Sequence, residues 1–151
     1  MKKYMGYGLA LMVFIAALWG YRMFSQKVPD VVQAGPDVVI HAAEMTRDFD
    51  VNGAGANEEY GGKIIRVTGT VTQVNLSGSV TLSGGSDGSE IVIGLDQRHQ
   101  QDVQKVTVGM QAVFQALYTG YEAGGVDKGD DLLSSLGATI HLRSGGLIKE
   151  N

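Results

Sequence analysis

Cysteine is missing from this 151-residue chain. Its absence excludes disulfide bonds, thiolate metal ligands and a cysteine nucleophile. It also excludes a lipid attached to a cysteine near the amino terminus. Proline is scarce, with Pro29 and Pro36 the only two. Both stand in a stretch without apolar periodicity, which predicts a linker over residues 25–36.

Charge is missing from Tyr4 to Tyr21, between Lys2 and Lys3 on one side and Arg22 on the other. A helix of this length rises about 27 Å, close to the roughly 30 Å thickness of a hydrocarbon core. The segment ends in bulky residues and offers no small-x-small cleavage site, which favours an uncleaved anchor over a cleaved signal peptide. We therefore expect a membrane anchor over residues 1–24 that contacts the lipid bilayer through residues 4–21.

The positive charges of the chain start predict its orientation. Lys2, Lys3 and the α-amine precede the apolar segment, whereas Arg22 and Lys27 follow it. Positive charge is retained on the cytoplasmic side of membranes. The amino terminus is therefore expected in the cytoplasm, with the rest of the chain on the far side of the membrane.

Acidic residues are missing before Asp30. All 16 acids follow, whereas four of the 12 Lys and Arg residues precede Val28, so the chain from Val28 onward carries a net charge of −8 with neutral histidines. Nucleic-acid affinity depends on cations that neutralise phosphates, so this balance disfavours nucleic acid as a partner. Anionic lipid headgroups are disfavoured for the same reason.

The domain over residues 37–151 begins with a helical pattern. Asp37 is a candidate N-cap, and apolar residues recur at helical spacing from Val38 to Phe49. The glycines and the asparagine of residues 52–55 are expected to break this amphipathic helix.

The period then changes to two, which is typical of strands. Strands are expected near residues 64–72, 80–82, 91–95, 111–121 and 138–143, with a short polar helix capped by Asp96 between the third and fourth. The expected core residues are Ile65, Val67, Val71, Ile91, Ile93, Phe114 and Ile140. This order predicts a mainly β fold: a five-stranded OB barrel with one amphipathic helix before it and a short helix between strands three and four, plus the N-terminal transmembrane helix. Another small antiparallel barrel or a β-sandwich fragment is the alternative.

The junction between helix and first strand carries a more specific pattern. It reads Phe49-x-x-Asn52-x-Ala54-x-Ala56-Asn57-x-x-Tyr60-x-Gly62-Lys63 and runs into Ile64-Ile65-Arg66-Val67-Thr68-Gly69-Thr70-Val71. It resembles the tRNA_anti-like family of OB-fold proteins, which are small bacterial envelope proteins and often lipoproteins. The resemblance implies a bacterial envelope protein, and the uncharged segment with its flanking charges predicts a single-pass protein of the inner membrane whose C-terminal domain is periplasmic or extracellular. Within the junction, Phe49 and Tyr60 are expected to pack the helix on the barrel, and Asn57 to hydrogen-bond the turn that enters the first strand.

Candidate chemistry is sparse. His41, His99 and His141 are far apart in sequence and lack carboxylate partners at ligand spacing, so they predict no zinc site. Asp127 lies in an acidic loop with Asp130 and Asp131, without the alternating ligand pattern of a calcium loop. We expect neither an enzyme nor a bound cofactor or metal.

OB barrels commonly bind through the outer face of strands two and three and the adjoining loops. In this chain the predicted surface consists of Asn75, Ser77, Thr81, Glu90, Val92, Tyr121 and Asp127. It is neutral to acidic and poor in aromatic residues. We therefore predict a membrane-anchored binding module that docks a protein partner in the cell envelope. The alternatives are binding of single-stranded nucleic acid or an oligosaccharide, and a structural role as a subunit of a larger envelope assembly.

Overall fold

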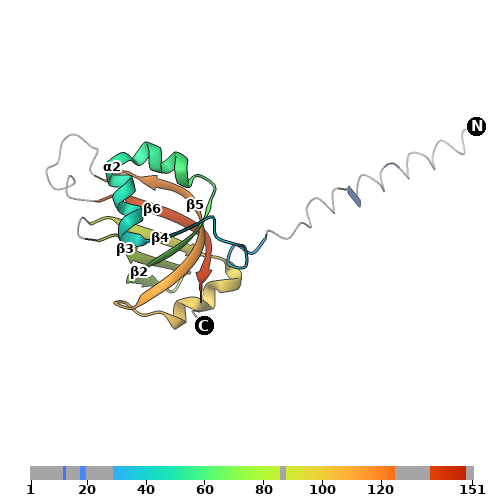
Figure 1. Cartoon of the computed structure of the whole chain (residues 1–151). Helices are drawn as coiled ribbons and strands as arrows, with labels where there is room; N and C mark the ends of the chain where they lie inside the picture. Colours follow the sequence, from blue (N-terminus) through green and yellow to red (C-terminus); the bar gives the residue numbers. More distant parts are fainter. Residues whose placement is uncertain (1–11, 13–17, 20–28, 86–87, 125–136, 149–151) are drawn as a thin grey trace, which may run out of the picture.

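The computed structural model describes residues 12, 18–19, 29–85, 88–124 and 137–148 (Figure 1). Almost all of the predicted anchor lies outside these residues, and so does Asp127. Within the described residues, no helix is long and apolar enough to cross a membrane. The domain boundaries at residues 24 and 36 stay predictions.

Five strands form a closed barrel. They are β2 (Ile64–Asn75), β3 (Ser79–Ser83), β4 (Glu90–Leu95), β5 (Gln111–Glu122) and β6 (Thr139–Leu147). Their order is β2–β3–β4–β6–β5, and β5 pairs back with β2 to close the barrel. The β4–β6 pair is parallel and the other barrel pairs are antiparallel. This is the strand order of an OB barrel, which confirms the five-stranded barrel of the predicted fold class.

The barrel interior is filled by alternate residues of each strand, the ones whose side chains face inward. All seven expected core residues are buried, and Phe114 is fully inaccessible to solvent. Gly69 lies on the inward face of β2, where a Cβ atom would stand only 2.7 Å from the Cβ of Ala42. Glycine at this position therefore lets the start of the helix approach the strand closely.

The helix before the barrel begins later than predicted. Residues Val38–His41 form a short strand, β1, which pairs in parallel with β2, and α2 spans Ala42–Tyr60. Asp37 does not cap the helix, because its side chain accepts a hydrogen bond from the Ile64 amide (2.8 Å) instead. The expected break in the helix is a kink at Asn52, whose φ and ψ are −152° and 78°. Beyond the kink the helix continues to Tyr60, with the Asn52 side chain accepting from the Gly55 amide (3.1 Å).

The two helices cover opposite ends of the barrel (Figure 1). The kinked helix α2 lies over the β3–β4 turn, where the Thr46 hydroxyl donates to the Gly84 carbonyl (2.6 Å). At the other end the 3-10 helix η1 (Gln97–Lys105) follows β4. Asp96 caps it as predicted, by accepting from the Arg98 amide (2.9 Å). We refer below to the α2 end and the η1 end of the barrel.

The segment before β1 packs on the barrel near the η1 end. The amide of Gln115, which is fully buried on β5, donates to the carbonyls of Val31 (2.7 Å) and Ala34 (2.6 Å). Its oxygen accepts from two nitrogens of Arg66 (2.8 and 3.0 Å). A Cβ atom at Gly146 would stand 2.7 Å from Val32, which shows how closely the segment approaches β6.

Candidate binding surface

The outer face of the barrel across β3, β4, β6 and β5 is a continuous grid of aligned side chains. The strand register places three cross-strand rows on it. The row nearest α2 contains Ser83, Glu90, Thr139 and Glu122. The middle row contains Thr81, Val92, His141 and Gly120. Farther toward the η1 end, Ser79 stands opposite Gly94, and Arg143 stands opposite Leu117.

This face consists mainly of small neutral residues. Serine, threonine and glycine fill half of the grid, which gives the face several small polar groups able to form hydrogen bonds. Its negative charges, Glu90 and Glu122, stand in the row nearest α2, whereas its cation, Arg143, stands toward the η1 end. The face therefore has a weak charge gradient along the strands.

The structure brings together some of the predicted surface residues and separates others. Thr81, Glu90 and Val92 share the grid, but Thr81 is only 8% exposed and so is buried, contrary to its predicted place on the surface. Asn75 and Ser77 lie in the β2–β3 turn at the η1 end, where the Asn75 side chain accepts from the Ser77 amide (3.0 Å) and hydroxyl (2.8 Å). The two turn residues therefore border the grid at its η1 end.

Tyr121 does not present its ring as the sequence suggested. Its ring packs on Phe49 at a centroid distance of 4.9 Å, and its hydroxyl approaches Gly53 of α2. Phe49 also contacts the rings of Tyr60 (5.7 Å) and Tyr118 (5.7 Å). This aromatic cluster confirms that Phe49 and Tyr60 pack the helix on the barrel.

Hydrogen bonds hold the tyrosines of the cluster in place. The Tyr60 hydroxyl donates to Asp48 (2.7 Å), and burial together with this carboxylate raises the pKa of Tyr60 far above its ordinary value. Burial raises the pKa of Tyr118 to about 12, and its hydroxyl donates to Asn57 (2.7 Å). Asn57 thus bonds β5 and not the turn into β2 as expected. Both tyrosines are neutral at ordinary pH and serve packing.

A shallow polar hollow of about 320 Å³ lies where β5 meets β6. Its lining includes Thr119, Tyr121, Glu122, His141 and Arg143. The Nε2 atom of His141 is buried, has no hydrogen bond to any described residue, and stands 3.6 Å from Glu122. Sequence reasoning missed His141 and Arg143 as surface residues, although their alternation with Ile140 and Leu142 already places them on the outward face.

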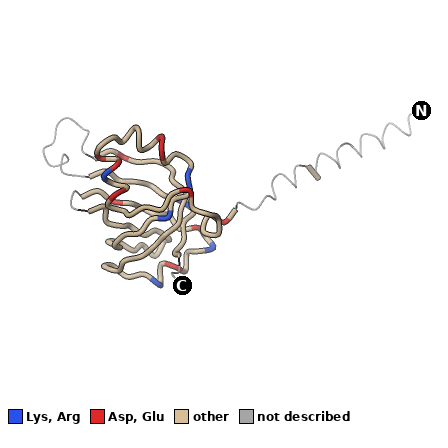
Figure 2. Tube along the Cα trace, in the orientation of Figure 1, with Lys and Arg blue, Asp and Glu red and all other residues tan. Residues whose placement is uncertain are grey.

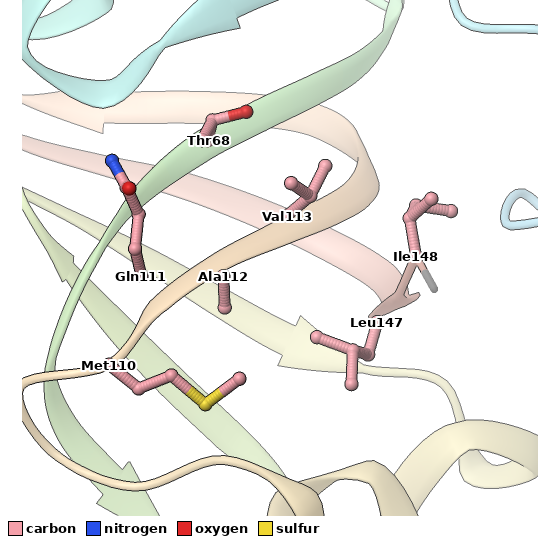
Figure 3. Close-up of a pocket in the computed structure, with 7 residues that line it drawn as sticks. All are labelled: Thr68, Met110, Gln111, Ala112, Val113, Leu147 and Ile148. Atoms are coloured by element: carbon pink, nitrogen blue, oxygen red, sulfur yellow. The ribbon is translucent and has the colours of Figure 1, made fainter. Parts of the chain in front are cut away.

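An apolar groove of about 450 Å³ lies at the rim of the η1 end (Figure 3). Met110, Val113, Leu147 and Ile148 supply its apolar walls, and Thr68 and Gln111 its polar ones. None of the described residues that line it is titratable. Nor do the described residues contain any group of three or more potential metal ligands.

Comparisons with known proteins found a family model and solved structures that are similar to this chain. The tRNA_anti-like family model matches residues 1–124. A solved lipoprotein from Klebsiella pneumoniae, which carries a provisional nucleic acid-binding name, superposes with a TM-score of 0.52 at 18% identity, covering 74% of this chain and 91% of its own. An asparaginyl-tRNA synthetase from Entamoeba histolytica matches at a TM-score of 0.35 and 15% identity, over 60% of this chain and 21% of its own. No protein with a curated description matches this sequence.

Proposed function

Since this chain belongs to the tRNA_anti-like family, we propose that it is a membrane-anchored binding module that docks a protein partner in the bacterial cell envelope. The docking surface is the grid across β3, β4, β6 and β5. The observation that carries the proposal is the composition of this grid, where small neutral side chains predominate. Such a surface suits a complementary polar protein face, with a basic group of the partner opposite Glu90 and Glu122.

Nucleic acid is the competing ligand, because the fold is one that often binds it and the Klebsiella pneumoniae neighbour carries such a name. OB domains that bind single strands combine a basic groove with exposed aromatic rings on which bases stack. Here the chain from Val28 onward has a net charge of −8, and the Tyr121 ring packs under α2. The lack of an open aromatic ring among the described residues of the barrel and α2 also weighs against an oligosaccharide, since sugars commonly stack on aromatic faces.

The anchor is the second part of the proposal. The uncharged segment from Tyr4 to Tyr21 would hold the chain in the bacterial inner membrane, with the amino terminus in the cytoplasm and the barrel on the outer side. A tether confines the barrel near the bilayer and raises its effective concentration toward membrane-bound partners. A docking surface of low intrinsic affinity would then suffice for specific contact.

Site-specific photo-crosslinking in cells tests the docking surface. A photoreactive residue at Val92 or Thr139, which are both partly exposed on the grid, should crosslink to one envelope protein, identified by mass spectrometry, whereas the same residue at Val51 on α2 should not. Glu90→Lys should weaken the crosslink, since it reverses a charge at the edge of the surface. Equal crosslinking from Val51 would place the docking surface elsewhere, and crosslinks to several subunits from all positions would indicate a structural role in an assembly.

Two further measurements test the remaining parts. The full chain in nanodiscs should leave the anisotropy of a labelled single-stranded oligonucleotide unchanged at low salt, and a tight, salt-sensitive rise would establish nucleic-acid binding instead. Protease added to spheroplasts should remove a C-terminal tag that is protected in intact cells. A tag that stays protected in spheroplasts would contradict the orientation.

A further inference from the structure

The two ends of the barrel differ in charge. Helix α2 carries five acids against one cation, Arg47. Figure 2 shows acidic positions along this helix at its end of the molecule. The acids are Glu44, Asp48, Asp50, Glu58 and Glu59. A large part of the acidity of the domain is therefore concentrated at the α2 end, and its net charge says little about the η1 end.

The exposed face of η1 is neutral to basic. Its exposed side chains are Gln97, Arg98, Gln100, Gln101, Gln104 and Lys105. The acid within this helix, Asp102, is buried and paired with Lys105. Asp96 at the cap is paired with Arg98 (2.8 Å). A negatively charged surface could thus approach this end without meeting an unpaired carboxylate of the helix.

Large apolar side chains are exposed around η1. Leu76 is 86% exposed, Val108 65% and Met110 40%. Leu76 belongs to the β2–β3 turn, which is bonded to this end through Leu95 and Gly78 (2.8 Å), and Val108 and Met110 belong to the connection from η1 to β5. The groove of Figure 3 continues the apolar surface from Met110 to Leu147. Apolar tips beside a glutamine-rich, weakly basic helix are typical of surfaces that enter a membrane interface.

The chain also reaches the barrel close to this end. Asp30 accepts a hydrogen bond from His99 of η1 (3.0 Å), and Val32 contacts β6 at Gly146. The uncharged segment ends at Tyr21. Nine residues span at most about 30 Å when fully extended, so the anchor would hold Asp30 within that distance of the bilayer.

We infer that the η1 end of the barrel rests on the surface of the bilayer, with Leu76, Val108 and Met110 in the lipid interface and Arg98 and Lys105 at anionic headgroups. This inference rests on the proposed anchor. A surface helix and its apolar neighbours enter about 5–10 Å into the headgroup boundary in such contacts. The acids of α2 then point away from the negatively charged membrane, and the grid faces sideways along it.

Fluorescence quenching in proteoliposomes tests this placement, and the absence of native cysteine makes single-site labelling clean. The full chain would be labelled at Leu76→Cys or Val108→Cys and reconstituted into vesicles of phosphatidylethanolamine and phosphatidylglycerol. Lipids with a nitroxide near the headgroup should quench these labels at least about twofold more than a label at Val51→Cys, because only the former lie within about 10 Å of the headgroup boundary. Val51 is a matched control, since it is 81% exposed but lies on α2.

A second variant tests the electrostatic part. Gln101→Glu with Gln104→Glu adds two exposed carboxylates to η1 and should reduce the quenching at position 76 on anionic vesicles more than on zwitterionic ones. Equal quenching at positions 76, 108 and 51 in chains that float with vesicles would overturn the inference and leave the anchor intact. Chains that do not float would refute both. If the labels at positions 76 and 108 are protected from solvent in cells but not quenched by lipid in vesicles, a protein partner and not the bilayer covers this surface, and the inference is overturned.

Discussion

The buried amide of Gln115 is predicted to hold the segment before β1 on the barrel. Its nitrogen donates two short neutral hydrogen bonds, to the Val31 and Ala34 carbonyls, and a longer one (3.4 Å) to the Val32 carbonyl, and its oxygen accepts a charge-assisted pair from Arg66. Gln115→Ala removes all of them. Each neutral bond contributes about 0.5–1.5 kcal/mol and the charge-assisted pair about 1.5–3 kcal/mol. The carbonyls become hydrated once the segment leaves the barrel, so the loss is expected to be smaller than the sum of these bonds. We expect a loss of about 2–3 kcal/mol in the free energy of unfolding.

The pattern of the loss distinguishes undocking from general destabilisation. Urea melts of the variant give the free energy, and hydrogen exchange shows where protection is lost. The amides of Val32, Gln33 and Ala34 should exchange faster. The amides that pair β2 with β5 should lose only as much protection as the loss in the free energy of global unfolding predicts. Gln111→Ala is the control, since Gln111 lies exposed on the same strand. A variant that keeps protection at residues 32–34, or loses less than about 0.5 kcal/mol, would refute this role of Gln115.

Three further predictions concern the core and the η1 end. Phe114→Ala should lower the free energy of unfolding by about 3–5 kcal/mol in denaturant melts, and a loss below about 1 kcal/mol would remove Phe114 from the core. Gly69→Ala should cost about 1–3 kcal/mol, because its Cβ atom would meet Ala42, and an unchanged melting temperature would contradict this contact. Burial raises the pKa of Asp30, but hydrogen bonds from His99 and from the Val32 amide hold it below its ordinary 3.8. The stabilisation by ionised Asp30 is therefore present above pH 3.8 and lost as the pH falls below it. The difference in urea midpoint between the wild-type chain and Asp30→Asn should accordingly become smaller on acidification. A difference that stays constant with pH would contradict this prediction.

Local sequence signals predicted the barrel because its strands depend on alternation that each segment carries by itself. The inward positions from Ile65 to Ile140 were correct for this reason, and so was the cap at Asp96. The start of the helix was wrong, because the β-branched run from Val38 to Ile40 fits the free edge of β2 and pairs there before the helix begins. Three residues are too few to show a period, so the helical spacing prevailed in the prediction.

The features that sequence reasoning missed depend on residues far apart in the chain. Gln115 stands on the outward phase of β5, where a polar residue predicts exposure. It is buried because residues 29–36 fold back over it, and no local signal marks that contact. No local signal marks the hydrogen bond between Asp30 and His99 either, because these residues are 69 positions apart in the sequence. Tyr121 was predicted to be exposed because the alternation of β5 places its side chain on the outward face. The sequence did not show that α2 lies over that end of the barrel.

The closure of the barrel has a consequence for the order in which the chain can fold. Ile64 pairs with Leu117 and Glu90 with Thr139, so neither seam can form until nearly the whole chain is available. Proteins that depend on pairing between such distant segments fold slowly, typically in milliseconds to seconds. The reason is that the entropy cost of closing the loop comes before the contacts that offset it. Until β6 arrives, the edges of β4 and β5 stay open to pairing with other chains. A chain that is truncated before Thr139 should therefore aggregate and not form a smaller stable barrel.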